Sequence, residues 1–213
     1  MKVSGGLTED GVIVGNTFDK YSSKNPIVRW IMNGFHASLN ELVDAAGPTS
    51  IHEVGCGEGY WVSRWKRQGL DARGSDFSPT VVAIANENAA EQDLPSDLFN
   101  VRSIYELRPE VDSADLVVCC EVLEHLEDPR AALEQLQSIA HRHLILSVPR
   151  EPLWSFMNMA RGRYWGQLGN TPGHIQQWSQ RGFIRLVAQY FDIDRVLAPI
   201  PWTMLHCRSR HKA

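Results

Sequence analysis

Apolar residues return along the chain with two different spacings. From Pro26 to Ala46 they recur every three or four residues, which predicts an amphipathic helix that ends before Gly47. After it, short apolar runs alternate with helical patterns, which is typical of a parallel, doubly wound sheet with helices on both faces. The expected strands are 50–54, 71–75, 98–102, 115–120, 143–148 and 191–197, with a last apolar stretch at 202–207, and further helices begin near residues 78, 129 and 179.

Two segments break this alternation. Residues 1–25 are rich in polar residues and glycine and are predicted to form a mobile arm that acts as a lid. Residues 150–173 combine prolines and glycines with aromatic side chains and are too long for an ordinary connection, so we expect a small cap insertion over the substrate. The helix at 26–46, a core at 48–149 and the C-terminal part of the sheet at 174–213 complete a single domain, whose 43% hydrophobic content is enough for a substantial core.

The strand at 50–54 runs into alternating glycines, Gly55, Gly57 and Gly59, and then into a helical segment. Glycine permits a positive φ and lets a ligand approach the main chain, so this strand, turn and helix predict a nucleotide-like ligand. Glu53 at the strand end would repel a pyrophosphate but would attract the ammonium and sulfonium of S-adenosylmethionine. The third glycine of a dinucleotide fingerprint is replaced by Tyr60. The turn therefore favours S-adenosylmethionine.

The next strand ends in Asp76, nineteen residues after Gly57. From this position a carboxylate accepts hydrogen bonds from both ribose hydroxyls of a bound nucleoside. Asp76 could instead cap the following helix, but Ser78 before Pro79 is the better N-cap, which leaves Asp76 for the ligand. Phe77 beside it is expected to cover the adenine.

Four motifs stand in a familiar order. They are Glu-Val-Gly-Cys-Gly-Glu-Gly at 53–59, Ser-Asp-Phe-Ser-Pro at 75–79, Val-Val-Cys-Cys-Glu-Val-Leu-Glu-His-Leu-Glu-Asp-Pro at 117–129 and Ser-Val-Pro-Arg-Glu-Pro at 147–152. Over roughly residues 48–200 the chain thus resembles the class I S-adenosylmethionine-dependent methyltransferases, in their type 11 or ubiquinone-biosynthesis-like branch. The resemblance implies a Rossmann-like α/β fold with a doubly wound, mostly parallel, seven-stranded sheet.

Strand ends, the arm and this resemblance together predict the cofactor contacts. They are Tyr21, Glu53, Gly55, Cys56, Gly57, Asp76, Phe77, Ser103, Ile104 and Glu121. For Tyr21, plain packing against the sheet edge is an equal alternative to a role in the lid.

The string Glu121-x-x-Glu124-His125 follows the fourth strand of the core. We expect its two carboxylates to lie one helical turn apart and to point the same way, with His174 at the end of the cap as a further partner. Relatives that methylate ubiquinone precursors or small-RNA ends hold Mg²⁺ in such a cluster, so the resemblance implies a divalent ion, Mg²⁺, Mn²⁺ or Fe²⁺, at Glu121, Glu124, His125 and His174. The alternative is a metal-free site in which His125 acts as the general base, with Glu121 and His174 as the other catalytic candidates.

The cap has two interpretations. Its aromatic and basic residues, Trp154 and Phe156 among them, can form a wall for an apolar acceptor that carries a phosphate or carboxylate, or a surface that contacts lipid headgroups. Alternatively, Leu153, Phe156, Met157 and Ala160 form a helical stripe that closes the core.

Charge and cysteines limit the remaining choices. The net charge of −4 argues against a dominant electrostatic grip on nucleic acid. Four cysteines without a C-x-x-C pair suggest reduced thiols in the cytoplasm, and neither a secretory leader nor a membrane-spanning segment is expected. We therefore expect methyl transfer to a small-molecule acceptor, on oxygen first, with nitrogen or carbon next and a small-RNA 2′-hydroxyl as the alternative from another class. The pattern favours no particular oligomer.

Overall fold

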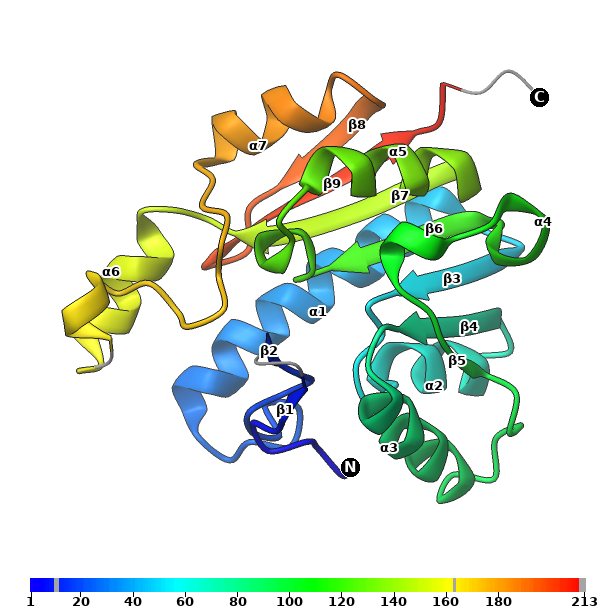
Figure 1. Cartoon of the computed structure of the whole chain (residues 1–213), viewed down its shortest axis with the longest axis horizontal. Coiled ribbons are helices and arrows are strands. Elements are labelled where there is room, and N and C mark those ends of the chain that lie inside the picture. Colours follow the sequence, from blue (N-terminus) through cyan, green and yellow to red (C-terminus); the bar gives the residue numbers. More distant parts are fainter. Residues whose placement is uncertain (10–11, 163, 211–213) are drawn as a thin grey trace.

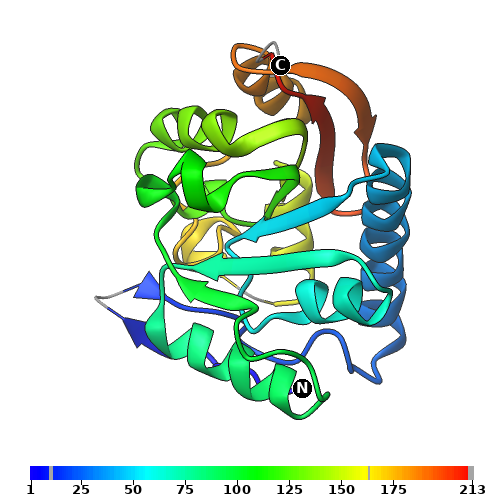
Figure 2. The same cartoon turned by 90° about the vertical axis from the view of Figure 1, so that its right-hand side faces the viewer.

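The structure, a computed structural model, describes residues 1–9, 12–162 and 164–210. A seven-stranded sheet with helices on both faces forms its centre (Figures 1 and 2). The strands are β1 (Thr8–Glu9), β2 (Val12–Ile13), β3 (Ser50–Val54), β4 (Asp71–Asp76), β5 (Phe99–Val101), β6 (Ala114–Cys120), β7 (Ala140–Pro149), β8 (Asp192–Leu197) and β9 (Trp202–Arg208). The α-helices are α1 (Pro26–Ala46), α2 (Tyr60–Arg67), α3 (Pro79–Ala90), α4 (Pro109–Asp112), α5 (Pro129–Ile139), α6 (Leu153–Ala160) and α7 (Gln180–Val187). The 3₁₀ helices are η1 (Ile104–Glu106), η2 (Leu123–His125) and η3 (Trp165–Gln167).

The large sheet has the order β5-β4-β3-β6-β7-β9-β8. Strands β3, β4, β5, β6 and β7 pair in parallel, and β9 runs antiparallel to both β7 and β8. This arrangement confirms the predicted doubly wound, mostly parallel, seven-stranded fold. The main difference lies in β7, which is four residues longer than the predicted 143–148, because it extends to Ala140, which pairs with Ala114 of β6, and to Pro149, which pairs with Trp202 of β9.

Local signals set the helix boundaries. Helix α1 occupies the predicted residues 26–46, since the Asn25 side chain accepts from two amides of its first turn and Gly47 ends it in the left-handed conformation. Ser78 caps α3, with Pro79 in its first turn, as predicted.

Two apolar clusters fill the two faces of the sheet. Because side chains alternate along a strand, Leu116 and Val118 of β6 pack on one face with α1, α2 and α3. Val117 and Cys119 pack on the other with α5 and α7. No helix of the described residues is long and apolar enough to cross a bilayer.

The arm and the cap flank the carboxyl ends of the parallel strands (Figure 1). In the arm, Thr8 pairs with Ile13 in a short antiparallel ladder, and the intervening residues 10–11 lie outside the described part. The predicted cap at 150–173 contains α6 and η3, and its residue 163 is likewise not described.

Candidate active site

The order of the strands places the site at the boundary between β3 and β6. From β3 the chain moves outward to β4 and β5 and then returns to form β6 on the other side of β3. Ligands of open α/β sheets bind at the carboxyl ends of the strands where this order reverses. At that point Gly55 has a φ of 76°, and a Cβ added to it would lie 2.2 Å from a methyl carbon of Val122. The turn after β3 and the segment after β6 are therefore in contact.

Glu53 places a buried carboxylate at the end of β3, and one of its oxygens has no partner among the described residues. Its side chain is 5% exposed, and its Oε2 has no hydrogen-bond partner among the described residues. Burial raises the pKa of Glu53 well above 4.5; the Val62 amide and the Lys20 ammonium oppose the shift, while Asp76 adds to it. A ligand ammonium would supply both the missing donor and the missing countercharge.

Asp76 connects the ends of β3 and β4. Its Oδ2 accepts from the Gly57 amide at 3.0 Å, and its Oδ1 accepts from the Ser78 amide at 3.1 Å. The Ser78 hydroxyl in turn accepts from the Val81 amide, so Ser78 is the N-cap of α3, as predicted. Burial raises the pKa of Asp76 against the opposing effect of the two amides. Carboxylate oxygens accept more than one hydrogen bond, so Asp76 retains capacity for ribose hydroxyls.

The other predicted cofactor contacts near Asp76 differ in the exposure and packing of their side chains. Phe77 is 49% exposed beside Asp76, whereas Ile104 is buried in the cluster that contains α5. The Ser103 hydroxyl accepts from the Tyr105 amide as the cap of η1. Cys56 packs so closely on Gly74 that a Cβ there would lie 2.7 Å from the Cβ of Cys56. Any ligand contact by Cys56, Ser103 or Ile104 would come mainly from the backbone.

Tyr21 lies over the start of α2. Its ring stacks on that of Tyr60 with centroids 3.7 Å apart and on that of His36 at 5.7 Å, and the Lys20 ammonium lies 5.4 Å from its centroid. Burial raises the pKa of Tyr21 well above 10, and the Glu53 charge adds to the shift. The ring packing of Tyr21 agrees with the interpretation that it only packs. Its electrostatic interaction with Glu53, the residue predicted to bind the cofactor, also agrees with a role in the lid.

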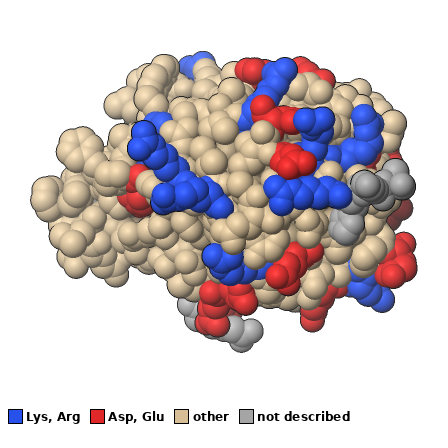
Figure 3. Space-filling view, turned by 90° about the horizontal axis from the view of Figure 1, so that it is seen from above, with Lys and Arg blue, Asp and Glu red and all other residues tan. Residues whose placement is uncertain are grey.

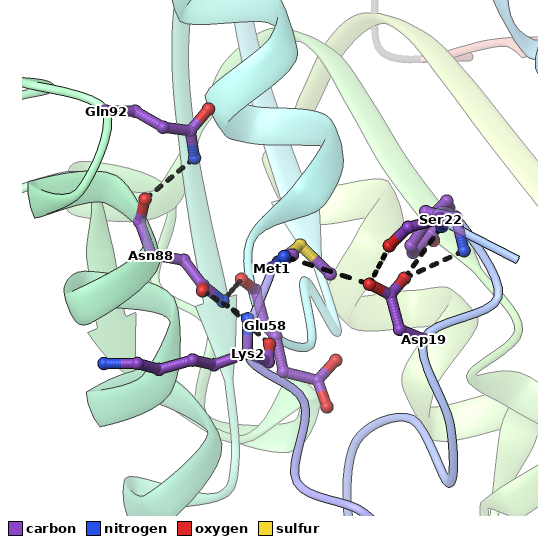
Figure 4. A network of polar contacts seen from close by, with 8 residues as sticks. Met1, Lys2, Asp19, Ser22, Glu58, Asn88 and Gln92 are labelled. Atoms are coloured by element: carbon purple, nitrogen blue, oxygen red, sulfur yellow. Dashed lines mark hydrogen bonds and ion pairs between the residues drawn. The ribbon is translucent and has the colours of Figure 1, made fainter.

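Glu58, inside the glycine turn, fastens the arm. Its Oε1 accepts from the amides of Ser4 and Asn16 at 3.0 and 2.7 Å, and its Oε2 accepts from the Asn16 side chain. Asn88 of α3 donates to the Glu58 carbonyl and accepts from the Lys2 amide (Figure 4). The arm that we predicted to be mobile thus contacts the cofactor turn through these hydrogen bonds.

Glu58→Ala is expected to release the arm. The amides of Ser4 and Asn16 would lose their acceptor, so the free energy of unfolding should fall by about 1–3 kcal/mol and limited proteolysis within the arm should accelerate. Glu87→Ala is the matched control, because it removes an exposed carboxylate that pairs with Lys2 of the same arm. Equal cleavage rates in the two variants would show that Glu58 does not hold the arm.

Glu121 follows β6 in a left-handed conformation, with a φ of 60°, which is uncommon for a residue other than glycine and recurs at functional sites. Ser147 of β7 donates to its Oε1 at 2.8 Å, and the Trp202 indole donates to its Oε2 at 2.5 Å. Burial raises the pKa of Glu121 to about 7. Sequence reasoning missed Ser147 and Trp202, although a polar residue near the end of an apolar strand was a signal for Ser147.

Glu124, His125 and His174 form a compact group. One potential ligand atom from each lies within 4.8 Å of the others. Glu124 is 1% exposed, and neither of its carboxylate oxygens has a hydrogen-bond partner among the described residues. Its carbonyl accepts from the amides of Ile175 and Gln176 at 2.8 and 2.9 Å, which brings His174 to the group. The structure does not bring Glu121 into it: the expected helical turn starts only at Leu123, so the two glutamates do not share a helical face.

The two imidazoles of this group can serve as ligands or as bases. His125 Nδ1 lies 2.9 Å from the Gly173 carbonyl, so it carries the proton in the neutral ring, and Nε2 keeps a free lone pair. Burial lowers the pKa of His125, and burial together with the His125 charge lowers that of His174 to about 4. Burial also raises the pKa of Glu124, with a further contribution from Glu121. Within the group no cation balances an ionised Glu124, and the Lys20 charge, outside the group, opposes the shift in its pKa.

The surface charges are interspersed. Figure 3 shows Lys, Arg, Asp and Glu side by side over the face seen from above, while the left-hand lobe, which Figure 1 identifies as the cap with α6, carries few of them. Among the residues of this face that the structure describes, no continuous basic stripe of the kind that tracks a nucleic-acid backbone is present.

Two comparisons by sequence bear on these residues. Residues 34–190 match the family model described as a methyltransferase domain. The chain is similar to the ubiquinone biosynthesis O-methyltransferase of Xanthomonas oryzae, with 34% identity over 96 residues, which are 45% of this chain and 39% of that protein. It is also 28% identical over 105 residues to the enzyme of the same name from Acinetobacter baumannii, over 47% of this chain and 44% of that protein. The matches thus span less than half the length of these relatives.

Solved structures share the fold. Magnesium protoporphyrin IX methyltransferase from Synechocystis PCC 6803 with bound SAH superposes with a TM-score of 0.67 at 22% identity, over 90% of this chain and 94% of that one. The methyltransferase domain of bacterial CtHen1 gives a TM-score of 0.65 at 17% identity, over 84% of this chain and 99% of that one.

Proposed function

The chain belongs to the methyltransferase domain family, and from this premise we propose that it transfers the methyl group of S-adenosylmethionine to an oxygen of a small apolar acceptor. The observation that carries the proposal is the buried carboxylate of Glu53 at the end of β3, whose Oε2 has no partner among the described residues, beside a glycine turn that Asp76 holds from the end of β4. A cationic nucleoside cofactor supplies what this arrangement lacks, an ammonium for Glu53 and hydroxyls for Asp76.

The residues around the turn then have separate tasks. Glu53 orients the amino acid end of the cofactor, Asp76 the ribose, and exposed Phe77 covers the base. Tyr21, stacked on Tyr60, keeps water from the reacting end. When bound, S-adenosylmethionine supplies an electrophilic methyl group to an in-line displacement, so the task left to the protein is alignment and removal of the acceptor's proton.

For that proton we infer two alternatives at Glu124, His125 and His174. The unpartnered oxygens of Glu124 and the free Nε2 of His125 fit a divalent cation, Mg²⁺, Mn²⁺ or Fe²⁺. Such an ion, when bound, lowers the pKa of a coordinated hydroxyl. Without an ion, His125 Nε2 itself would accept the proton, with the Gly173 carbonyl fixing its tautomer.

The cap supports an apolar acceptor. Phe156, Trp165 and Leu168 are each at least 65% exposed there, next to the site, so the cap can cover a lipid-like molecule or contact lipid headgroups. The names of the curated relatives support oxygen as the acceptor atom, with nitrogen or carbon as alternatives. All four cysteines are free, which supports a reducing compartment, the cytoplasm.

A transfer assay distinguishes the acceptor classes. The wild-type chain would receive S-adenosylmethionine with catechols, long-chain phenols or carboxylic acids in one arm and short RNA duplexes in the other, and release of S-adenosylhomocysteine would be measured. We expect turnover in the first arm. A small-RNA 2′-hydroxyl remains the second candidate, because the chain carries the Glu-x-x-Glu-His string at 121–125 that small-RNA methyltransferases of the resembling family can share, and turnover with RNA alone would reject the small-molecule proposal.

A further inference from the structure

A cavity of about 310 Å³ lies between the end of the arm and the start of α1. Its lining contains three cations, Lys20, Lys24 and Arg29, together with neutral polar side chains, and no carboxylate. Its volume suits a small ligand or one end of a larger one. We call this cavity the basic pocket.

The cations of the basic pocket form no ion pair with a carboxylate among the described residues, although the Lys20 charge also acts on the buried carboxyls of Glu53, Glu121 and Glu124. Lys2, Lys66 and Arg142 each reach a carboxylate within 3.4 Å, but none of the three pocket cations is in such a pair in the part of the chain that the structure describes. Like charges held together repel one another, so an anion that enters the pocket relieves this repulsion.

The nearest acid along the chain is directed elsewhere. Asp19 accepts from the amides of Tyr21 and Ser22 at 3.0 Å each, and its Oδ2 lies 3.8 Å from the amino group of Met1 (Figure 4). Its charge is therefore engaged with the first residue of the arm and with its own turn. Asp19 does not line the basic pocket.

The basic pocket adjoins the proposed reaction centre. Tyr21 lines the pocket, and its stacked partner Tyr60 begins the helix that follows the cofactor turn. Lys20, at the same boundary, is close enough to Glu53 for its charge to oppose the effect of burial on the pKa of that carboxyl. His36, also in the lining, has an Nε2 without a partner among the described residues.

We propose that the basic pocket binds the phosphate or carboxylate group of the methyl acceptor. Arg29 offers a planar fork that matches either group, and the two lysines add point charges. An acceptor anchored in this way would present its apolar part toward the cofactor. The proposal rests on the function proposed above and adds to it the chemical class of the acceptor.

Equilibrium titration of the full chain with phenyl phosphate and with benzoate tests this proposal. The pocket variant is Lys20→Gln, Lys24→Gln and Arg29→Gln combined. The matched control, Arg67→Gln, Arg108→Gln and Arg181→Gln combined, removes the same charge from exposed arginines that do not line the pocket. We expect wild type and control to bind at least one probe alike and the pocket variant to bind it about tenfold more weakly, the equivalent of one lost charge-assisted hydrogen bond.

Each protein is also titrated with S-adenosylhomocysteine, which reports the fold and the cofactor site independently. Equal affinity of both variants for the anionic probes, or no probe binding by a wild type that binds S-adenosylhomocysteine, would overturn the proposal and leave the proposed function standing. A folded wild type that fails to bind S-adenosylhomocysteine would instead contradict the proposed function.

Vesicles then identify the source of the anion. Competition with phenyl phosphate by phosphatidic acid vesicles, but not by phosphatidylcholine vesicles, would support a lipid-borne phosphate. Phenyl phosphate binding that neither vesicle affects would support a water-soluble acceptor.

Discussion

If Glu124, His125 and His174 hold a divalent ion, exhaustive chelation is expected to abolish methyl transfer, and addition of Mn²⁺, Fe²⁺ or Mg²⁺ is expected to restore it. Glu124 is buried with two unpartnered oxygens, and His125 and His174 bring ligand atoms within 4.8 Å. Glu124→Gln and His174→Ala should each lower activity by at least about 100-fold, because loss of groups that merely support a metal ligand already costs up to that much. Glu127→Gln, an exposed neighbour, is the control.

The metal-free alternative gives the opposite pattern. Undiminished turnover in excess chelator, together with loss of turnover in His125→Ala, would reject the ion and favour His125 as the general base. Calorimetric titration with Mn²⁺ adds a readout besides activity. Glu124→Gln should bind Mn²⁺ much more weakly than wild type, whereas Glu121→Gln should bind it nearly as well, because Ser147 and Trp202 hold Glu121 outside the group.

Glu53→Gln is expected to weaken cofactor binding by about ten- to a hundredfold. The amide has nearly the shape of the carboxylate but cannot pair with the cofactor's ammonium, and a hydrogen bond between charged groups contributes about 1.5–3 kcal/mol. Glu106→Gln, which changes an exposed carboxylate on η1, should leave the affinity unchanged. Similar affinities for the two variants, measured by calorimetry with S-adenosylhomocysteine, would show that Glu53 is not the ammonium partner.

The same residue predicts a dependence on pH. Burial raises the pKa of Glu53 well above 4.5, so in the free protein the carboxyl loses its proton only at higher pH. Cofactor affinity of the wild type should therefore rise with pH through that raised pKa, whereas Glu53→Gln should show no such rise. The folded protein also binds this proton more tightly than the unfolded chain does, so the free energy of unfolding falls as pH rises from 4.5 toward the raised value. Glu53→Gln should make that fall smaller, because Asp76, Glu121 and Glu124, whose pKa values burial also raises, keep their own contributions.

Local signals made much of the fold predictable. Helix α1 was predictable because apolar residues recur every three or four positions without a break between the N-cap Asn25 and Gly47. Strand β3 and its glycine turn follow from a short apolar run and the positive φ that Gly55 adopts. The sequence also predicted that the carboxylates of Glu53 and Asp76 lie at the same edge of the sheet, because their strands, β3 and β4, are parallel neighbours.

Features that depend on tertiary contacts were not predictable. No sequence pattern indicates that Glu121 takes a positive φ or that its partners come from β7 and β9. The sequence did not indicate where the arm binds, because its acceptor, Glu58, lies within the glycine motif at 53–59, and that motif was already explained by cofactor binding. The basic pocket escaped notice because Lys20, Lys24 and Arg29 are not adjacent in the sequence, and the turn into α1 brings them to one cavity.

Calorimetric titration of the wild-type chain with S-adenosylhomocysteine tests the central claim most directly, since it needs neither the acceptor nor an ion. The account predicts saturable binding at one site per chain, lost or strongly weakened in Glu53→Gln and retained in Glu106→Gln. No binding by wild-type protein that circular dichroism shows to be folded would contradict it.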